Sequence, residues 1–183
     1  MNIEVEIKVK VENFAEVKEK VSKTGKLVKA IKQIDDYYVP SHRNFFAKKP
    51  PTEWLRIRTN PDKVVFEYDK SINMRPDGDY DYAEEYETEI LQKEEMQKIL
   101  GFLDFKKIVT VEKNREYWQC GGIEVALDDV KGLGTFIEAE AKGDFKDDKE
   151  AKIACIKFLE DLGIQNVEKI QIKKGYPELV LER

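Results

Sequence analysis

Near its N-terminus the chain reads Ile3-Glu4-Val5-Glu6-Ile7-Lys8-Val9-Lys10-Val11, an alternation of aliphatic and charged residues. Side chains two residues apart on a β-strand share a face, so this stretch predicts a strand with one aliphatic face and one charged face. An ordinary sheet strand with a core face and a solvated face has the same pattern. The remaining strands have to show whether the charged face meets water or a ligand.

The composition favours one globular domain, residues 1–183. Hydrophobic residues make up 41% of the 183 residues, which is enough for a single core. A net charge of −5 disfavours a nucleic-acid partner, because proteins that bind duplexes usually present a basic face. We therefore expect no DNA or RNA partner.

Neither a membrane partner nor a secretory signal is expected. No stretch approaches the roughly 20 apolar residues of a membrane-spanning helix, and no apolar run with a basic flank precedes the first strand. The two cysteines, Cys120 and Cys155, lack CxxC or CxxH spacing. Free thiols in a cytoplasmic protein are the simplest interpretation.

Hydrophobic periodicity predicts about three helices and about seven further strands, joined mostly as antiparallel hairpins. Each predicted helix has an apolar face, and a glycine follows each one. The helices are expected near residues 13–25, 93–100 and 147–162, and the strands near residues 27–38, 54–59, 64–70, 83–91, 106–118, 123–130 and 135–141.

Charges of one sign recur two residues apart on several of these strands. Like charges at such positions repel slightly, whereas a solvated face normally mixes the two signs. The pattern therefore favours a face that serves a ligand. The doublets are Glu4 and Glu6, Arg56 and Arg58, Glu85 and Glu87, Lys113 and Arg115, and Glu138 and Glu140.

Two architectures fit this pattern. In the first, the charged faces meet water and three helices cover the aliphatic face of a sheet, as in an interaction protein. In the second, the strands close into an antiparallel barrel with a charged interior and helices outside. Burying unpaired charges costs several kcal/mol each, so such a barrel requires a multiply charged ligand. A polyanion held by Arg and Lys fits, with carboxylates holding hard divalent cations that bridge to phosphate oxygens.

Five motifs in consistent order resemble those of the CYTH superfamily of triphosphate tunnel metalloenzymes. The similarity runs from Glu4 to about Leu179, and the second and fifth motifs are most similar to the CyaB-type branch, the class IV adenylyl cyclases. The motifs are Glu4-Val5-Glu6-Ile7-Lys8, Gln33-Ile34-Asp35-Asp36-Tyr37-Tyr38, Leu55-Arg56-Ile57-Arg58, Lys113-Asn114-Arg115 and Leu127-Asp128-Asp129-Val130-Lys131-Gly132-Leu133-Gly134-Thr135-Phe136-Ile137-Glu138-Ala139-Glu140.

The resemblance implies an α+β fold in which an eight-stranded antiparallel closed β-barrel, the triphosphate tunnel, carries helices on its outside. It also implies Mg²⁺ or Mn²⁺ as cofactor. The metal ligands would be carboxylates, namely Glu4, Glu6, Asp128, Glu138 and Glu140. The triphosphate would be bound by Lys8, Arg56, Arg58, Lys70, Lys113 and Arg115. Asp128, Glu6 and Lys8 would act directly in catalysis, with Asp128 either binding metal or positioning the nucleophile.

One stretch departs from the family pattern. The family hairpin usually returns with a Tyr-Lys pair, whereas this chain reads Val65-Phe66-Glu67-Tyr68-Asp69-Lys70, so that Lys70 or Asp69 takes the place of the family lysine. We assign Lys70. Glu85 and Glu87 match the acidic fifth strand of the family, where a site role and a structural role are both possible.

The resemblance implies an enzyme that converts ATP to cyclic AMP and pyrophosphate. A triphosphatase acting on thiamine triphosphate, a nucleoside triphosphate or inorganic tripolyphosphate is the alternative, because hydrolysis needs only a water in place of the ribose 3′-hydroxyl. A non-catalytic polyphosphate-binding or nucleotide-binding module on the same barrel is a further alternative. A monomer or a homodimer is expected.

Overall fold

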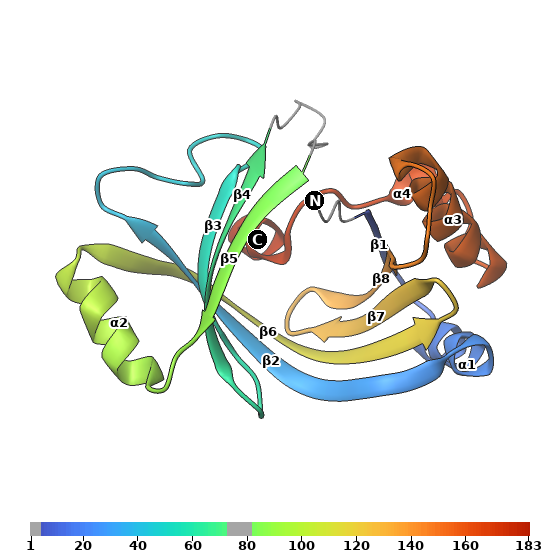
Figure 1. Cartoon of the computed structure of the whole chain (residues 1–183), viewed down its shortest axis with the longest axis horizontal. Coiled ribbons are helices and arrows are strands. Elements are labelled where there is room, and N and C mark those ends of the chain that lie inside the picture. Colours follow the sequence, from blue (N-terminus) through green and yellow to red (C-terminus); the bar gives the residue numbers. More distant parts are fainter. Residues whose placement is uncertain (1–4, 73–81) are drawn as a thin grey trace. The chain divides into compact units, whose positions relative to one another are not determined.

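The computed structural model describes residues 5–72 and 82–183, which contain eight strands and five helices (Figure 1). The strands are β1 (Glu6–Lys10), β2 (Lys26–Pro40), β3 (Glu53–Thr59), β4 (Val64–Ile72), β5 (Tyr82–Glu89), β6 (Phe105–Cys120), β7 (Ile123–Val130) and β8 (Gly134–Ala141). The helices are α1 (Phe14–Thr24), α2 (Lys93–Phe102), α3 (Asp148–Asp161), α4 (Val167–Ile170) and α5 (Tyr176–Leu181). The predicted strands and the three longer helices are confirmed, and two short helices follow them.

The strands form one sheet in the order β1-β8-β7-β6-β2-β3-β4-β5. The predicted eight-stranded antiparallel architecture with helices outside is confirmed. In the described residues this order has two ends, β1 and β5, whereas a fully closed barrel has none. Of the helices in the described part of the chain, none is both long and apolar enough to span a lipid bilayer.

The chain divides into two compact units. The first unit comprises Met1–Ile31 and Lys113–Lys173, and the second comprises Lys32–Glu112 and Lys174–Arg183. The long strands β2 and β6 run through both units, so each unit takes one part of each strand (Figure 1).

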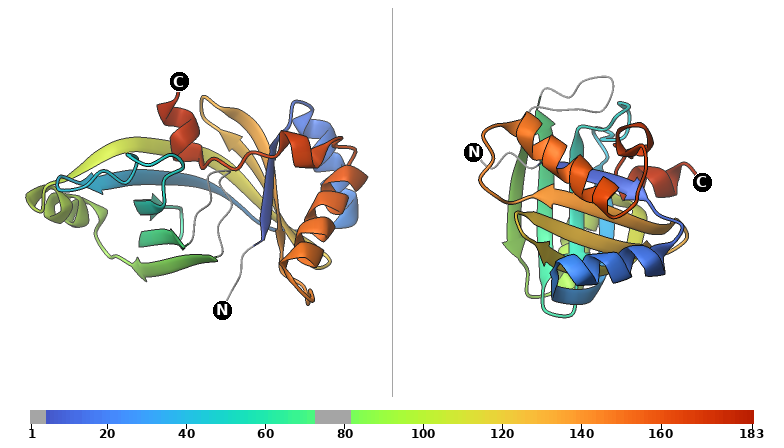
Figure 2. Two further views of the ribbon diagram at one scale, coloured as in Figure 1. Left: turned by 90° about the horizontal axis from the view of Figure 1, so that it is seen from above. Right: turned by 90° about the vertical axis from the view of Figure 1, so that its right-hand side faces the viewer.

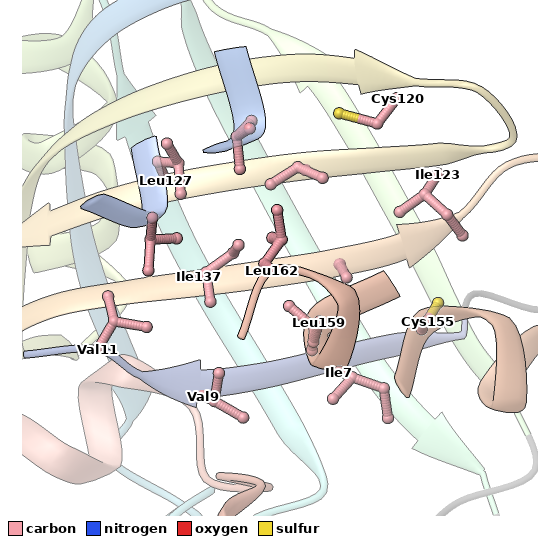
Figure 3. Packing of buried hydrophobic residues seen from close by; sticks show 14 of the residues in the cluster. Ile7, Val9, Val11, Cys120, Ile123, Leu127, Ile137, Cys155, Leu159 and Leu162 are labelled. Atoms are coloured by element: carbon pink, nitrogen blue, oxygen red, sulfur yellow. The ribbon is translucent and has the colours of Figure 1, made fainter. Parts of the chain in front are cut away.

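In the first unit, the aliphatic sides of the strands face α1 and α3. Ile7 and Val9 of β1 are buried with Ile137 of β8 in one cluster, into which α3 inserts Leu159 (Figure 3). Both helices lie on the same face of β1, β7 and β8 (Figure 2). The alternation of the first strand therefore has the predicted meaning, because its odd-numbered residues build the core.

The N-terminus of α3 shows why this helix begins where it does. The Asp147 side chain accepts a hydrogen bond from the Glu150 backbone N–H at 2.9 Å, which satisfies one of the free donors of the first turn. Asp147 is thus the N-cap residue of α3. The capped helix then presents Ala151, Cys155 and Leu159 as its buried residues.

In the second unit, the aliphatic side of β3 packs against β2 and α2. Leu55 and Ile57 are buried with Tyr38 and with Leu100 of α2. On this side Asp36 is also buried, but it is fully engaged: Lys93 Nζ lies 2.9 Å from Oδ2, and Thr110 Oγ1 donates to Oδ1 at 2.6 Å. These contacts hold α2 and β6 against β2.

Two residues of α3 give a direct test of the first core. Leu159 is fully buried, whereas Ile153 on the same helix is 65% exposed. Leu159→Ala should lower the free energy of unfolding by about 2–5 kcal/mol, because a cavity forms where the side chain packed. Ile153→Ala should change it by less than about 0.5 kcal/mol. Chemical denaturation of the two variants measures both values; similar losses would contradict this placement of α3.

Candidate active site

The charged side of the first unit brings together seven of the predicted site residues. Strand register sets Glu6 opposite Glu140 and Lys8 opposite Glu138, and it sets Arg115 opposite Asp128. Residues directly opposite each other in an antiparallel pair share a face. These side chains therefore all lie on the face of the sheet opposite the aliphatic residues. We call this set the first charged cluster: Glu6, Lys8, Lys113, Arg115, Asp128, Glu138 and Glu140.

Arg115 lies at the centre of this cluster. Its Nε donates to Asp128 Oδ1 at 2.7 Å, and its Nη2 bonds to both Asp128 and Glu138. Lys113 Nζ lies 3.7 Å from Asp128 Oδ2, and Lys8 Nζ lies 3.8 Å from Glu138 Oε1. Asp128 is completely buried and Glu138 nearly so. Because burying an unpaired charge is costly, these pairs are what permits a charged face in the folded protein.

The environment of Glu6 shifts the pKa of its carboxyl group. The residue has solvent-accessible surface at the start of β1, yet protein atoms crowd its carboxyl group. This desolvation, followed by repulsion from the Glu138 carboxylate, raises the pKa of Glu6 to about 7, although Lys8 and Arg115 act in the opposite direction. A carboxylate with such a pKa takes up either a proton or a cation near neutral pH.

The donor chemistry of the first charged cluster suits a hard divalent cation. Glu6, Glu138 and Glu140 offer carboxylate oxygens, which Mg²⁺ and Mn²⁺ prefer. Within residues 5–72 and 82–183, no group of three or more His, Cys, Asp or Glu side chains is already gathered closely enough to hold a metal ion. The predicted ligand Glu4 lies outside the described residues.

The second unit has a charged side of its own, built on β2, β3 and β4. Register sets Asp35 opposite Arg58 and Glu67 opposite Arg56, and Asp69 follows Glu67 on the same face. These five residues form the second charged cluster. All three carboxylates are buried.

Both arginines of the second charged cluster form ion pairs with carboxylates. Arg58 Nε donates to Asp35 Oδ1 at 2.9 Å, and Arg58 Nη1 lies 3.2 Å from Glu67 Oε2. Arg56 Nη2 bonds to Glu67 and lies 3.3 Å from Asp69 Oδ2. The Arg56 guanidinium also donates to the Tyr37 hydroxyl at 3.0 Å. Residues of neighbouring strands thus fix the positions of both guanidinium groups.

The assignment of Lys70 to the site is wrong in this structure. Lys70 lies opposite Glu53 of β3 and Glu84 of β5, on the side of β4 that faces away from Arg56 and Arg58. Asp69 is the residue that joins the arginines, so a carboxylate takes the place in which we expected a lysine. The physical reason is the strict two-residue period of the strand.

The acidic doublet of β5 lies on the charged side of the second unit. Glu85 is opposite Asp69 and Glu87 is opposite Glu67, and both residues are exposed. They therefore add negative charge at the edge of the second charged cluster. Both residues belong to the second unit, whereas the first charged cluster belongs to the first unit.

Sequence reasoning missed three residues on the charged faces. Asp35 and Glu67 belong to the second charged cluster, and Glu124 lies opposite Glu140 in the first unit. The alternation in residues 33–37 could have revealed Asp35, which shares a face with Gln33 and Tyr37. The others depend on the pairing between strands, which no single strand reveals.

The chain matches known proteins over almost its whole length. The family model described as the CYTH domain matches residues 2–172. A Methanocaldococcus jannaschii protein named "Putative adenylate cyclase MJ0240" is 35% identical over 184 residues, covering 97% of this chain and 98% of that protein.

Solved structures agree with this match. The PH1819 protein from Pyrococcus horikoshii OT3 has a TM-score of 0.79 and 32% identity, with 98% of each chain covered. A Hippeastrum protein, HpAC1, is described as a "putative adenylyl cyclase" that reveals a dominant triphosphatase activity. It shares the fold, with a TM-score of 0.63 and 16% identity over 90% of this chain and 89% of that one. The family model and the archaeal relatives together show that the chain belongs to the CYTH domain family.

Proposed function

We propose that this chain is a divalent-metal-dependent enzyme that converts ATP to cyclic AMP and pyrophosphate. The observation that carries the proposal is the first charged cluster, in which three glutamates and three cationic side chains share one face of β1 and β6–β8. A triphosphate with a bound divalent cation presents the complementary charges. The name of the 35% identical M. jannaschii protein supports the cyclase reaction in particular.

The cationic residues of both clusters are proposed to bind phosphate oxygens. Lys8 and Lys113 supply point charges, whereas Arg56, Arg58 and Arg115 supply planar forks that match two oxygens at once. Their carboxylate partners hold the guanidinium groups in place before phosphate binds. Catalysis of phosphoryl and nucleotidyl transfer depends mainly on such positioning and charge neutralisation.

The carboxylates of the first charged cluster are proposed to hold Mg²⁺ or Mn²⁺. Glu6, Glu138 and Glu140 are the described ligands, and Glu4 is the further ligand that the family pattern implies. A bound ion would neutralise charge on the phosphate oxygens. Asp128 is fully buried and held by Arg115 and Lys113, which suits a residue that orients its neighbours. Lys8 lies opposite Glu138, with its Nζ 3.8 Å from Glu138 Oε1, and is proposed to contact a phosphate oxygen during catalysis.

Hydrolysis of a triphosphate is the second candidate. It uses the same phosphate and metal contacts and differs only in the nucleophile, a water instead of the ribose 3′-hydroxyl. The dominant triphosphatase activity described for the Hippeastrum protein of the same fold supports this alternative. A binding module without turnover is the third candidate. We further propose one domain over residues 1–183, acting as a monomer or a homodimer in the cytoplasm.

Turnover distinguishes the candidates. The protein is incubated with ATP, thiamine triphosphate or inorganic tripolyphosphate in the presence of Mg²⁺ or Mn²⁺, and the products are separated by chromatography. Cyclic AMP with pyrophosphate from ATP is the expected result. Release of phosphate without cyclic AMP would establish a triphosphatase instead. Binding without any product would leave a binding module, and neither binding nor turnover would overturn the proposal.

A matched pair of glutamate variants tests the metal-binding role. Glu138→Gln keeps the shape of the side chain but removes a charge from the first charged cluster, so turnover should fall by at least about a hundredfold. Glu12→Gln removes the same charge from an exposed residue and should change turnover less than about twofold. Equal effects of the two substitutions would contradict the assignment. Circular dichroism of both variants confirms that they are folded.

The raised pKa of Glu6 predicts how metal binding depends on pH. The protonated acid is a poor ligand, so Mn²⁺ affinity should rise as the pH increases from 6 to 8, through the pKa of about 7. Glu6→Gln should weaken Mn²⁺ binding and flatten this rise. Without metal, ionised Glu6 is destabilising above its pKa, so Glu6→Gln should raise the melting temperature at pH 8 more than at pH 5. Titration calorimetry and thermal melts measure the two effects. If Mn²⁺ affinity still rises steeply with pH in Glu6→Gln, the rise is due to a residue other than Glu6.

A further inference from the structure

The five side chains of the second charged cluster do not balance in charge. Asp35, Glu67 and Asp69 are 2%, 4% and 8% exposed, and together they carry three negative charges when all three are ionised. The two guanidinium groups, Arg56 and Arg58, carry two positive charges. Buried charges are normally paired one to one, and these five described residues contain one more carboxylate than guanidinium groups.

Unsatisfied atoms identify the place of the excess. Asp69 Oδ1, Arg56 Nε and Glu67 Oε2 are buried and have no hydrogen-bond partner, and Glu67 Oε2 lies 3.2 Å from Arg58 Nη1. Asp69 contacts Arg56 only through Oδ2, at 3.3 Å. Unsatisfied buried polar atoms are rare in folded proteins and require an explanation. Here the Asp69 carboxylate and the Arg56 guanidinium are neighbours, and each has one buried atom without a hydrogen bond.

The electrostatics of Asp69 agree with this geometry. Desolvation, together with the neighbouring Glu67 and Glu85 carboxylates, raises the pKa of Asp69 to about 7 even though Arg56 lowers it. Arg56 therefore compensates the charge of Asp69 only in part, because Arg56 is shared with Glu67.

We propose that Asp69 is a specificity-determining residue that competes with phosphate oxygens for Arg56, so that this cluster favours a triphosphate carrying a bound divalent cation over an uncomplexed one. This inference rests on the proposed function, because it concerns the same phosphate-binding arginines. A bare polyphosphate has to displace Asp69 from Arg56 and then remain beside that carboxylate. A bound cation reduces the repulsion between the two anions.

Asp69→Asn gives the direct test, because the amide keeps the shape of the side chain and loses the charge. The matched control is Glu84→Gln, which removes one charge from β5 on the side that faces Lys70 and not Arg56. Titration calorimetry with inorganic tripolyphosphate is performed in EDTA and again with excess Mg²⁺. In EDTA, Asp69→Asn should bind about tenfold more tightly than the wild type, and Glu84→Gln should differ by less than about twofold. With Mg²⁺ the gain of Asp69→Asn should be less than about threefold.

The outcomes separate this inference from the proposed function. An affinity of Asp69→Asn in EDTA equal to or below that of the wild type would overturn the competition, and equal gains with and without Mg²⁺ would overturn the preference. If tripolyphosphate fails to bind both proteins even with Mg²⁺, the proposed function itself fails. Adding Arg56→Ala to Asp69→Asn should abolish the gain, because the two residues act on one another.

A second variant guards against loss of folding. Glu85 is exposed and lies opposite Asp69, so Glu85→Gln should fold normally and should raise the affinity for bare tripolyphosphate by about two- to threefold. No gain in this variant would also count against the competition.

Discussion

The bridge from Arg115 to Asp128 and Glu138 is the interaction on which the charged side of the first unit depends. Asp128 is completely buried on β7, and a buried carboxylate without a partner would be strongly destabilising. Arg115 reaches it from β6 and reaches Glu138 of β8 with the same guanidinium group. One side chain thus ties three strands together on the face that the hydrophobic core does not cover.

The second unit repeats this arrangement with fewer charged side chains. Arg56 bridges two carboxylates of β4, as Arg115 bridges carboxylates of β7 and β8. The first charged cluster adds two lysines, Lys8 and Lys113, whereas the second adds only Arg58.

Much of this arrangement could be predicted from single strands, and the rest could not. The alternation in β1 correctly assigned its aliphatic residues to the core and its Glu6 and Lys8 to the charged side. The two-residue period of a strand is enough to show which residues share a face. Which residues meet across strands depends on register, which the turn geometry sets. The error over Lys70 arose because the end of β4 carries Asp69 and Lys70 in succession, so that charge alone does not say which of them faces the arginines.

The stability of the protein does not explain why the two clusters exist. Well-packed hydrophobic residues in place of a buried ion cluster are often neutral or even stabilising. The opposite sides of the same strands already provide two hydrophobic cores. Because neighbouring residues of a strand point to opposite faces, a shift of one residue would exchange core and charge completely. The aliphatic residues of each strand therefore fix the register in which Arg115 and Arg56 meet their carboxylates.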